Sequence, residues 1–207
     1  MPKILGSSLA EHRERTRSAL FAALSHLMGE RGFDAVSLAD IAAEAGIGRT
    51  AVYNHFPDKE SLLLAFIEHE TSTYVRALDA SLAEVDDPVG QLRVYVRQQL
   101  QLERSYHFAP GPDLREVVSR EAAMHLRAHV GQVEALLRKI LTRAIEAGDI
   151  PAQHVDAVVQ LVHACLSGRR VPRAEPERSE FIAATELFVL RAVGAPAAWP
   201  VRAAEVA

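Results

Sequence analysis

Apolar residues recur along most of this chain at spacings of three and four, the pattern of helices that bury one face. No segment has the strict alternation and β-branched enrichment expected of strands. The first helix is predicted over residues 11–29, where Gly29 and Gly32 are expected to end it. Its apolar stripe consists of Leu20, Ala23, Leu24, Leu27 and Met28. The pattern therefore predicts an all-α protein.

Two short helices are predicted next, with a glycine turn between them. Ser37 is expected to cap the first, because its hydroxyl can accept from a free amide and Asp40 completes a capping box. Gly46 ends this helix, and the second stops before Pro57. The residue before a proline is pushed away from helical geometry, so Phe56 is expected to be extended.

Longer helices follow at regular intervals. Asp58 is placed to cap a helix that continues to about Ser81, and Pro88 opens another. A break rich in proline and glycine follows at 109–112. Further helices are predicted over 113–147, with a possible interruption near Ser119, over 152–168 and over 179–193, before a loose tail at 195–207.

The last two predicted helices are apolar on more than one side. In 152–168 two apolar stripes are present, and 179–193 leaves almost no polar face. Such helices must be covered from several directions, and a second subunit is the economical cover. We therefore predict a homodimer through 152–168 and 179–193. The alternative is that other helices of the same chain cover them.

Composition indicates the class of protein and its cellular location but says little about its function. The chain has 207 residues, 49% of them apolar and 24% charged, with a net charge of −4, as is ordinary for a folded soluble protein. No apolar run of membrane-spanning length and no signal-peptide pattern is present, so we expect a cytoplasmic protein that does not bind membranes. The single cysteine, Cys165, is expected to be a buried structural thiol.

The residues between Gly46 and Lys59 fit neither a core helix nor a solvated one. Two short helices joined by a tight glycine turn form a helix-turn-helix, which inserts its second helix into the DNA major groove. Arg49 could bind a guanine edge, and Asn54 an adenine or a phosphate. Donors suited to phosphate oxygens are Thr50, Tyr53, His55 and Lys59. The simpler alternatives are a solvated Arg49, a Tyr53 ring packed inward and a Ser37 that only caps its helix.

One run here resembles the DNA-binding signature of TetR-family transcriptional regulators: FDAVSLADIAAEAGIGRTAVYNHFPDKESLLLAF, from Phe33 to Phe66. The resemblance implies a helix-turn-helix domain of three N-terminal helices at 1–57, and a helical ligand-binding and dimerisation domain at 58–194. It further implies base or backbone contacts by Arg49, Thr50 and Asn54, and phosphate contacts by Ser37, Tyr53, His55 and Lys59. Ala51 departs from the family, where a hydroxyl residue is common.

The resemblance also implies a small-molecule inducer that binds among the middle helices and releases a repressor from a palindromic operator. Candidate pocket residues combine apolar walls with a few polar groups. They are Tyr106, His107, Phe108, Met124, His125, His129 and His163. No cofactor is expected. Repression and activation both fit, because the position of the operator relative to the promoter decides between them.

The alternatives to this function are a metal-responsive regulator, an enzyme and a scaffold. His125 and His129 lie four apart, with Glu121 one turn earlier, and could chelate zinc, nickel or copper. A metal-responsive regulator is therefore an alternative, although singly bonded histidines explain the same pattern. An enzyme on a helical bundle would need paired Glu-x-x-His motifs or another catalytic signature, and the sequence has none. A pure scaffold would leave the residues from Arg49 to Lys59 unexplained.

Overall fold

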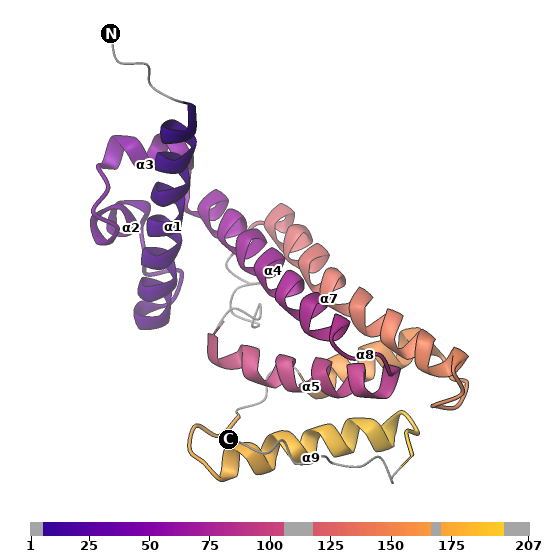
Figure 1. Ribbon diagram of the computed structural model, residues 1–207. Helices are drawn as coiled ribbons and strands as arrows, with labels where there is room; N and C mark the ends of the chain where they lie inside the picture. The colour runs from indigo at the N-terminus through magenta and orange to yellow at the C-terminus, as the bar shows by residue number, and fades with distance from the viewer. Residues whose placement is uncertain (1–5, 106–117, 167–170, 197–207) are drawn as a thin grey trace. The chain divides into compact units, whose positions relative to one another are not determined.

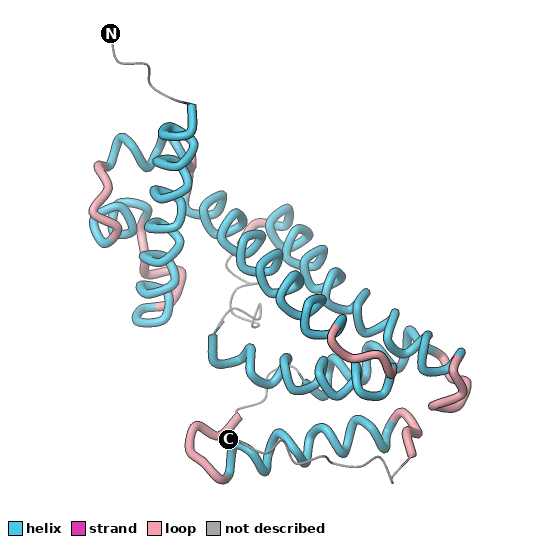
Figure 2. The backbone as a smooth tube through the Cα atoms, in the orientation of Figure 1, coloured by secondary structure: helices cyan, strands magenta, loops and turns pink. Residues whose placement is uncertain are grey.

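The computed structural model describes residues 6–105, 118–166 and 171–196. Every regular element in these ranges is an α-helix, as Figures 1 and 2 show, so the predicted all-α class is confirmed. The helices are α1 (Gly6–Arg31), α2 (Leu38–Glu44), α3 (Arg49–His55), α4 (Lys59–Ala83), α5 (Pro88–Ser105), α7 (Arg120–Glu146), α8 (Val155–Leu166) and α9 (Glu177–Ala192).

The chain forms two compact units. The first contains the described residues up to Ser72 together with those from 118 to His129. The second contains the remainder, from Thr73 along α5 and from Val130 onward. Helices α4 and α7 therefore contribute to both units. The functional domain limits given above, after residues 57 and 194, stay predictions.

The helix ends largely follow local chemistry, and the clearest difference from the sequence prediction is at Gly29. Helix α1 continues through Gly29 to Arg31, so the predicted stop at Gly29 is wrong. Glycine inside a helix costs only about 1 kcal/mol, which this long helix can bear. The chain turns at Gly32, where φ is 75° and a side chain would be strained.

Side chains cap three other helices, and the cap at Asp58 is the one predicted from the sequence. The Asp58 carboxylate accepts from the amide of Ser61 at 2.7 Å in the first turn of α4. The Asp87 carboxylate accepts from the amide of Gly90 at the start of α5. The Ser119 hydroxyl accepts from the amide of Ala122 at 3.2 Å, and α7 begins beside it. The predicted helical residues 113–117 lie outside the described ranges, so the interruption near Ser119 stays a prediction. Helices α8 and α9 begin at 155 and 177 rather than at 152 and 179.

In the first unit, α1 packs against α2 and α2 against α3. Its fully buried side chains come from all four N-terminal helices: Leu20, Leu24, Ile41, Val52, Leu62 and Leu63. The Phe21 ring meets the edge of the Phe66 ring at 5.6 Å between centroids, which joins α1 to α4. Each such buried side chain contributes about 1.5–3 kcal/mol. This core fixes the position of the two short helices.

In the second unit, α5 packs against α8 and α9 (Figure 1). Its core contains Tyr74, Leu78, Leu92, Tyr95, Leu137, Leu141 and Val159. One buried polar side chain, Gln91, is fully used: its amide nitrogen donates to the carbonyls of Leu82 at 2.9 Å and Val85 at 2.8 Å. Its amide oxygen accepts from Arg143 at 2.8 Å. These bonds tie the α4–α5 connection to α7.

The structure bears on two further expectations, the lack of a membrane-spanning segment and the burial of Cys165. Within the described ranges, each helix is too short or too polar to cross a membrane. Cys165 was expected to be buried, but it is only half-buried and packs against the core of the second unit.

Candidate nucleic-acid interface

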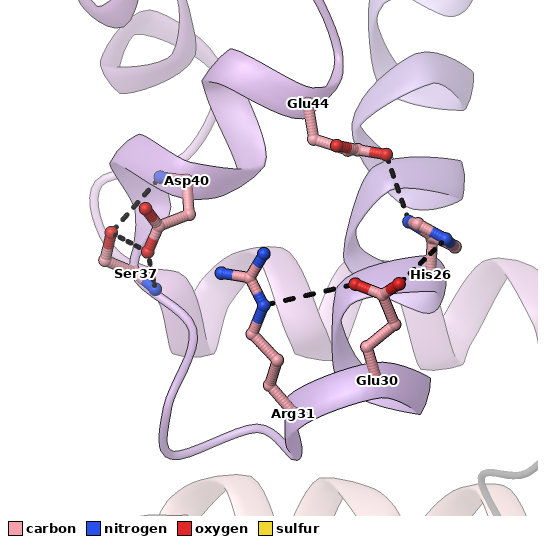
Figure 3. A network of polar contacts seen from close by, with 6 residues as sticks. All are labelled: His26, Glu30, Arg31, Ser37, Asp40 and Glu44. Carbon is pink, nitrogen blue, oxygen red and sulfur yellow. Dashed lines mark hydrogen bonds and ion pairs between the residues drawn. The ribbon is translucent and has the colours of Figure 1, made fainter.

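The first helix of the motif is held by a reciprocal cap. The Ser37 hydroxyl accepts from the Asp40 amide at 3.1 Å, and the Ser37 amide donates to the Asp40 carboxylate at 2.9 Å, as Figure 3 shows. The capping box predicted from the sequence is therefore confirmed. Hydrogen bonds from the Ser37 side chain and backbone lower the pKa of Asp40 below its ordinary value. The Ser37 hydroxyl also bonds the carboxylate at 2.6 Å, so a phosphate would have to compete for its proton.

The turn after α2 determines which face of α3 is exposed. Gly46 has a φ of 65°, a conformation that a glycine adopts without strain. The next amide, that of Ile47, bonds back to the Ala42 carbonyl at 2.9 Å. Gly48 then stands at the N-terminus of α3, and Val52 is the side chain of α3 that is fully buried. Phe56 is extended, as predicted, with φ −139° and ψ 123°.

The opposite face of α3 is polar and uncovered. Arg49, Thr50, Tyr53 and Asn54 are exposed, Tyr53 by 47%, and His55 is half-buried. In the described part of the chain, no hydrogen bond or ion pair engages the first four. Their donors therefore stay available to a partner, which satisfies the first geometric requirement of a recognition helix.

Lys59 is held differently from the other candidates. Its ammonium donates to the Phe33 carbonyl at 2.9 Å and lies 4.4 Å from the centre of the Phe33 ring. A second carbonyl, that of Asp34, lies at 3.4 Å. The lysine thereby fastens the start of α4 to the α1–α2 loop. Three ammonium protons leave at most one for a phosphate. Sequence reasoning missed this clamp because the two segments are 26 residues apart.

A second contact that the sequence did not reveal joins α1 to α2. His26 Nδ1 lies 3.0 Å from the Glu44 carboxylate, and its Nε2 lies 3.6 Å from Glu30, which Arg31 also approaches (Figure 3). All four side chains are well exposed, so the network adds little stability in water. It orients α2 against α1 more than it strengthens the fold.

The structure describes only some of the candidate ligand-binding residues. Tyr106, His107 and Phe108 lie outside the described residues, as do the side chains of His125 and His129. Met124 is exposed on the part of α7 that belongs to the first unit, and His163 is half-buried on α8 in the second. Among described residues, no three His, Cys, Asp or Glu side chains are grouped as metal ligands.

Helices α8 and α9 combine a buried face with an exposed apolar one. Large side chains stand uncovered on this chain at Leu161, Leu187 and Phe188, which are 70%, 41% and 60% exposed. On the buried side of α9, Glu186 accepts from Arg97 at 2.5 Å and lies 3.6 Å from Arg93. This buried ion pair fixes the rotation of α9 on α5 and thereby the direction in which Phe188 points.

Comparisons with known proteins agree with this geometry. Residues 20–66 match the model of the bacterial regulatory proteins of the tetR family. The nucleoid occlusion factor SlmA of Haemophilus influenzae is 28% identical over 135 residues, covering 63% of this chain and 58% of that protein. The chain therefore aligns with little more than half the length of this curated relative.

Solved structures share most of the fold. PfmR of Thermus thermophilus, a TetR-family regulator, is 26% identical with a TM-score of 0.67, over 83% of this chain and 97% of its own. The fatty acid degradation regulator FadR of Bacillus halodurans has a TM-score of 0.75 over 87% and 97%, and at 15% identity it supports the fold alone. Residues 20–66 thus carry the DNA-binding segment of the tetR-family regulatory proteins, and the described chain has the fold of a TetR-family regulator.

Proposed function

We propose that this chain is a cytoplasmic, homodimeric transcriptional repressor that binds a palindromic operator and is released from it by a small molecule. The observation that carries the proposal is the polar face of α3, exposed on a helix that is fixed from behind by Val52 and by the glycine turn. The match of residues 20–66 to the tetR-family model favours regulation over catalysis.

In this proposal α3 lies in the major groove. Arg49 stands at its N-terminus, the end of a recognition helix that reaches base edges, and donates two bonds to guanine. Thr50 and Asn54 contact a base or the adjacent backbone. Tyr53 and His55 bind phosphates, which fix the register of the protein on the duplex. At the margins, Ser37 and Lys59 contact phosphate in addition to their roles within the fold.

The exposed apolar residues of α8 and α9 support the dimer. A monomer would leave Leu161 and Phe188 in water, whereas a two-fold interface covers the same patch on both copies. A dimer also explains a palindromic operator, because two heads read two half-sites about 34–36 Å apart.

Two relatives with bound small molecules, and one hydrogen bond within the first unit, support the release of DNA by a ligand. RolR, solved with resorcinol, is 27% identical over 91% of this chain and 92% of its own, with a TM-score of 0.55. FadR of Bacillus subtilis, solved with stearoyl-CoA, shares the fold at 16% identity. In this chain Glu60, in the first turn of α4, accepts from the Ser119 amide at 3.1 Å. Movement at the start of α7 would reach α4 one residue after Lys59.

The test is selection of genomic fragments by the purified protein at two salt concentrations. Phosphate contacts weaken steeply with salt for every sequence, while base contacts leave preferred sites bound. We expect one or a few palindromic sites, and no enrichment by an Arg49→Ala/Asn54→Ala variant. To exclude a co-purified inducer, the selection is repeated with unfolded and refolded protein. Recovery of no preferred site after refolding would contradict the proposal.

A further inference from the structure

Three uncharged polar groups of the second unit are buried and lack hydrogen-bond partners among the described residues. They are the hydroxyl of Tyr74 on α4, and the hydroxyl of Tyr95 and the amide nitrogen of Gln99 on α5. Tyr95 is 0% exposed and Tyr74 is 7% exposed. Buried polar groups in native proteins are nearly always bonded, because an unbonded group has lost its water without compensation. Three in one core are therefore unusual.

The three groups are neighbours. Burial raises the pKa of Tyr74, and the nearby Tyr95 phenol raises it further. Tyr95 and Gln99 are four residues apart on α5 and so share a face of the helix. Gln99 lies close enough to lower the pKa of Tyr95 slightly against the larger effect of burial, although its amide nitrogen does not meet hydrogen-bond geometry. Two helices thus bring unused donors to one place.

We propose that Tyr74, Tyr95 and Gln99 form the recognition site for the small molecule that regulates this protein, and that this molecule is neutral, largely apolar and bears carbonyl or hydroxyl oxygens. This inference rests on the proposed ligand-controlled function. The three groups offer donors, so their natural complement is a set of acceptor oxygens. The surrounding side chains are aliphatic, Leu78 and Leu137 among them, as in an ordinary site for an apolar molecule.

Charge decides against an anionic ligand. The Glu134 carboxylate on α7 faces Tyr95 and, after burial, is the next cause of its raised pKa. Glu134 itself accepts from Gln160 at 3.3 Å. Arg93, on the same helix as Tyr95, is largely buried, but its Nε lies 3.6 Å from the Glu186 carboxylate, to which it is directed. A carboxylate or phosphate in this core would be desolvated and repelled.

The first measurement compares the stability of matched variants without added ligand. Tyr95→Phe and Gln99→Met remove groups that have no partner among the described residues, so the urea midpoint should stay the same or rise. Gln91→Met, on the same helix, removes a buried amide that makes three hydrogen bonds, and its midpoint should fall. If Tyr95→Phe and Gln99→Met lower the midpoint as much as Gln91→Met, these groups are structural and the assignment is wrong.

The second measurement compares four small probes of similar size by ligand-observed NMR and calorimetry: benzamide, resorcinol, benzoate and benzylammonium. Benzamide and resorcinol should bind the protein at least about tenfold more tightly than benzoate. Each of Tyr74→Phe, Tyr95→Phe and Gln99→Met should weaken the binding of benzamide by about two- to tenfold, the worth of one neutral hydrogen bond.

Several outcomes would overturn the inference. They are binding of benzoate or benzylammonium as tight as that of benzamide, no binding of either neutral probe at millimolar concentration, or affinities unchanged in all three variants. Failure of the wider proposal looks different: the neutral probes would bind as expected while the wild-type protein selected no DNA site.

Discussion

Helices α3 and α9 both leave side chains uncovered, but the chemistry of the two surfaces is opposite. On α3 the exposed residues are polar, and Val52 alone anchors the helix from behind. On α9 Leu187 and Phe188 are exposed, while Glu186 on the buried side is held by arginines. Exposed donors suit the edges and phosphates of a duplex, whereas exposed apolar area is stabilised by another protein surface. The exposure of side chains does not by itself separate the two helices; the chemistry of the exposed side chains does.

A charge on the exposed apolar surface of α9 should have the largest effect, because this surface is the proposed dimer interface. Phe188→Asp should destabilise the dimer by about 2–4 kcal/mol, because a charge replaces an interface side chain. Sedimentation equilibrium should show monomers at concentrations where the wild-type protein is dimeric. The control is Met124→Asp, which alters an equally exposed apolar residue elsewhere and should leave the dimer intact. An unchanged dimer in Phe188→Asp would show that α9 is not the interface.

A second change removes the proposed base contact of Arg49 and is expected to leave the proposed dimer unchanged. Arg49→Ala should lower the affinity for the selected operator by about 1–3 kcal/mol, with relaxed preference at one base pair. Fluorescence anisotropy with the operator and with single-base variants measures both effects. Arg15→Ala is the control, since this exposed arginine pairs only with Glu11 one turn earlier among its described contacts. Equal losses in the two variants would mean that Arg49 acts only through general charge.

Lys59 has a structural role within the fold and a proposed role in binding phosphate, and one substitution can separate the two. Lys59→Met should destabilise the protein by about 1–2 kcal/mol, because the Phe33 carbonyl and ring lose the ammonium. The urea midpoint measures this loss. The slope of operator affinity against salt reports the phosphate role separately, and should decrease by about one if the lysine also binds DNA. A reduced slope without loss of stability would contradict the clamp.

The smallest effect concerns the cap of α2. The pKa of Asp40 is lowered in the folded protein by its bonds from Ser37, so its contribution is present above the ordinary value of 3.8. That contribution is lost as the pH falls below about 4 and through the lowered value. Urea midpoints from pH 7 down to pH 3 should fall less steeply in Asp40→Asn than in the wild type. Parallel curves would contradict the assigned role.

Local chemistry made much of the fold predictable. The capping box at Ser37, the turn at Gly46 and the extended Phe56 each depend on a few consecutive residues, and all three were predicted correctly. The stop at Gly29 failed because a glycine in a long, well-packed helix is tolerated.

Contacts between distant segments were not predictable. The Lys59 clamp on Phe33 and the contact of His26 with Glu44 join residues whose spacing carries no periodic signal. The same holds for Tyr74 and Tyr95, which the sequence presents as ordinary aromatic residues of apolar stripes. Only the packing of α4 and α5 reveals that these two hydroxyls have no hydrogen-bond partner among the described residues.

The most direct test of the account compares two duplexes, the selected operator and the same bases in scrambled order. The affinity ratio is measured at two salt concentrations for the wild type and for Arg49→Ala/Asn54→Ala. For the wild type we expect a high ratio of operator to scrambled-duplex affinity that persists when salt is raised. For the variant we expect a ratio near one, with the oligomeric state and the unfolding midpoint unchanged. If the variant keeps the wild-type ratio, the polar face of α3 does not read the sequence, and the central claim is wrong.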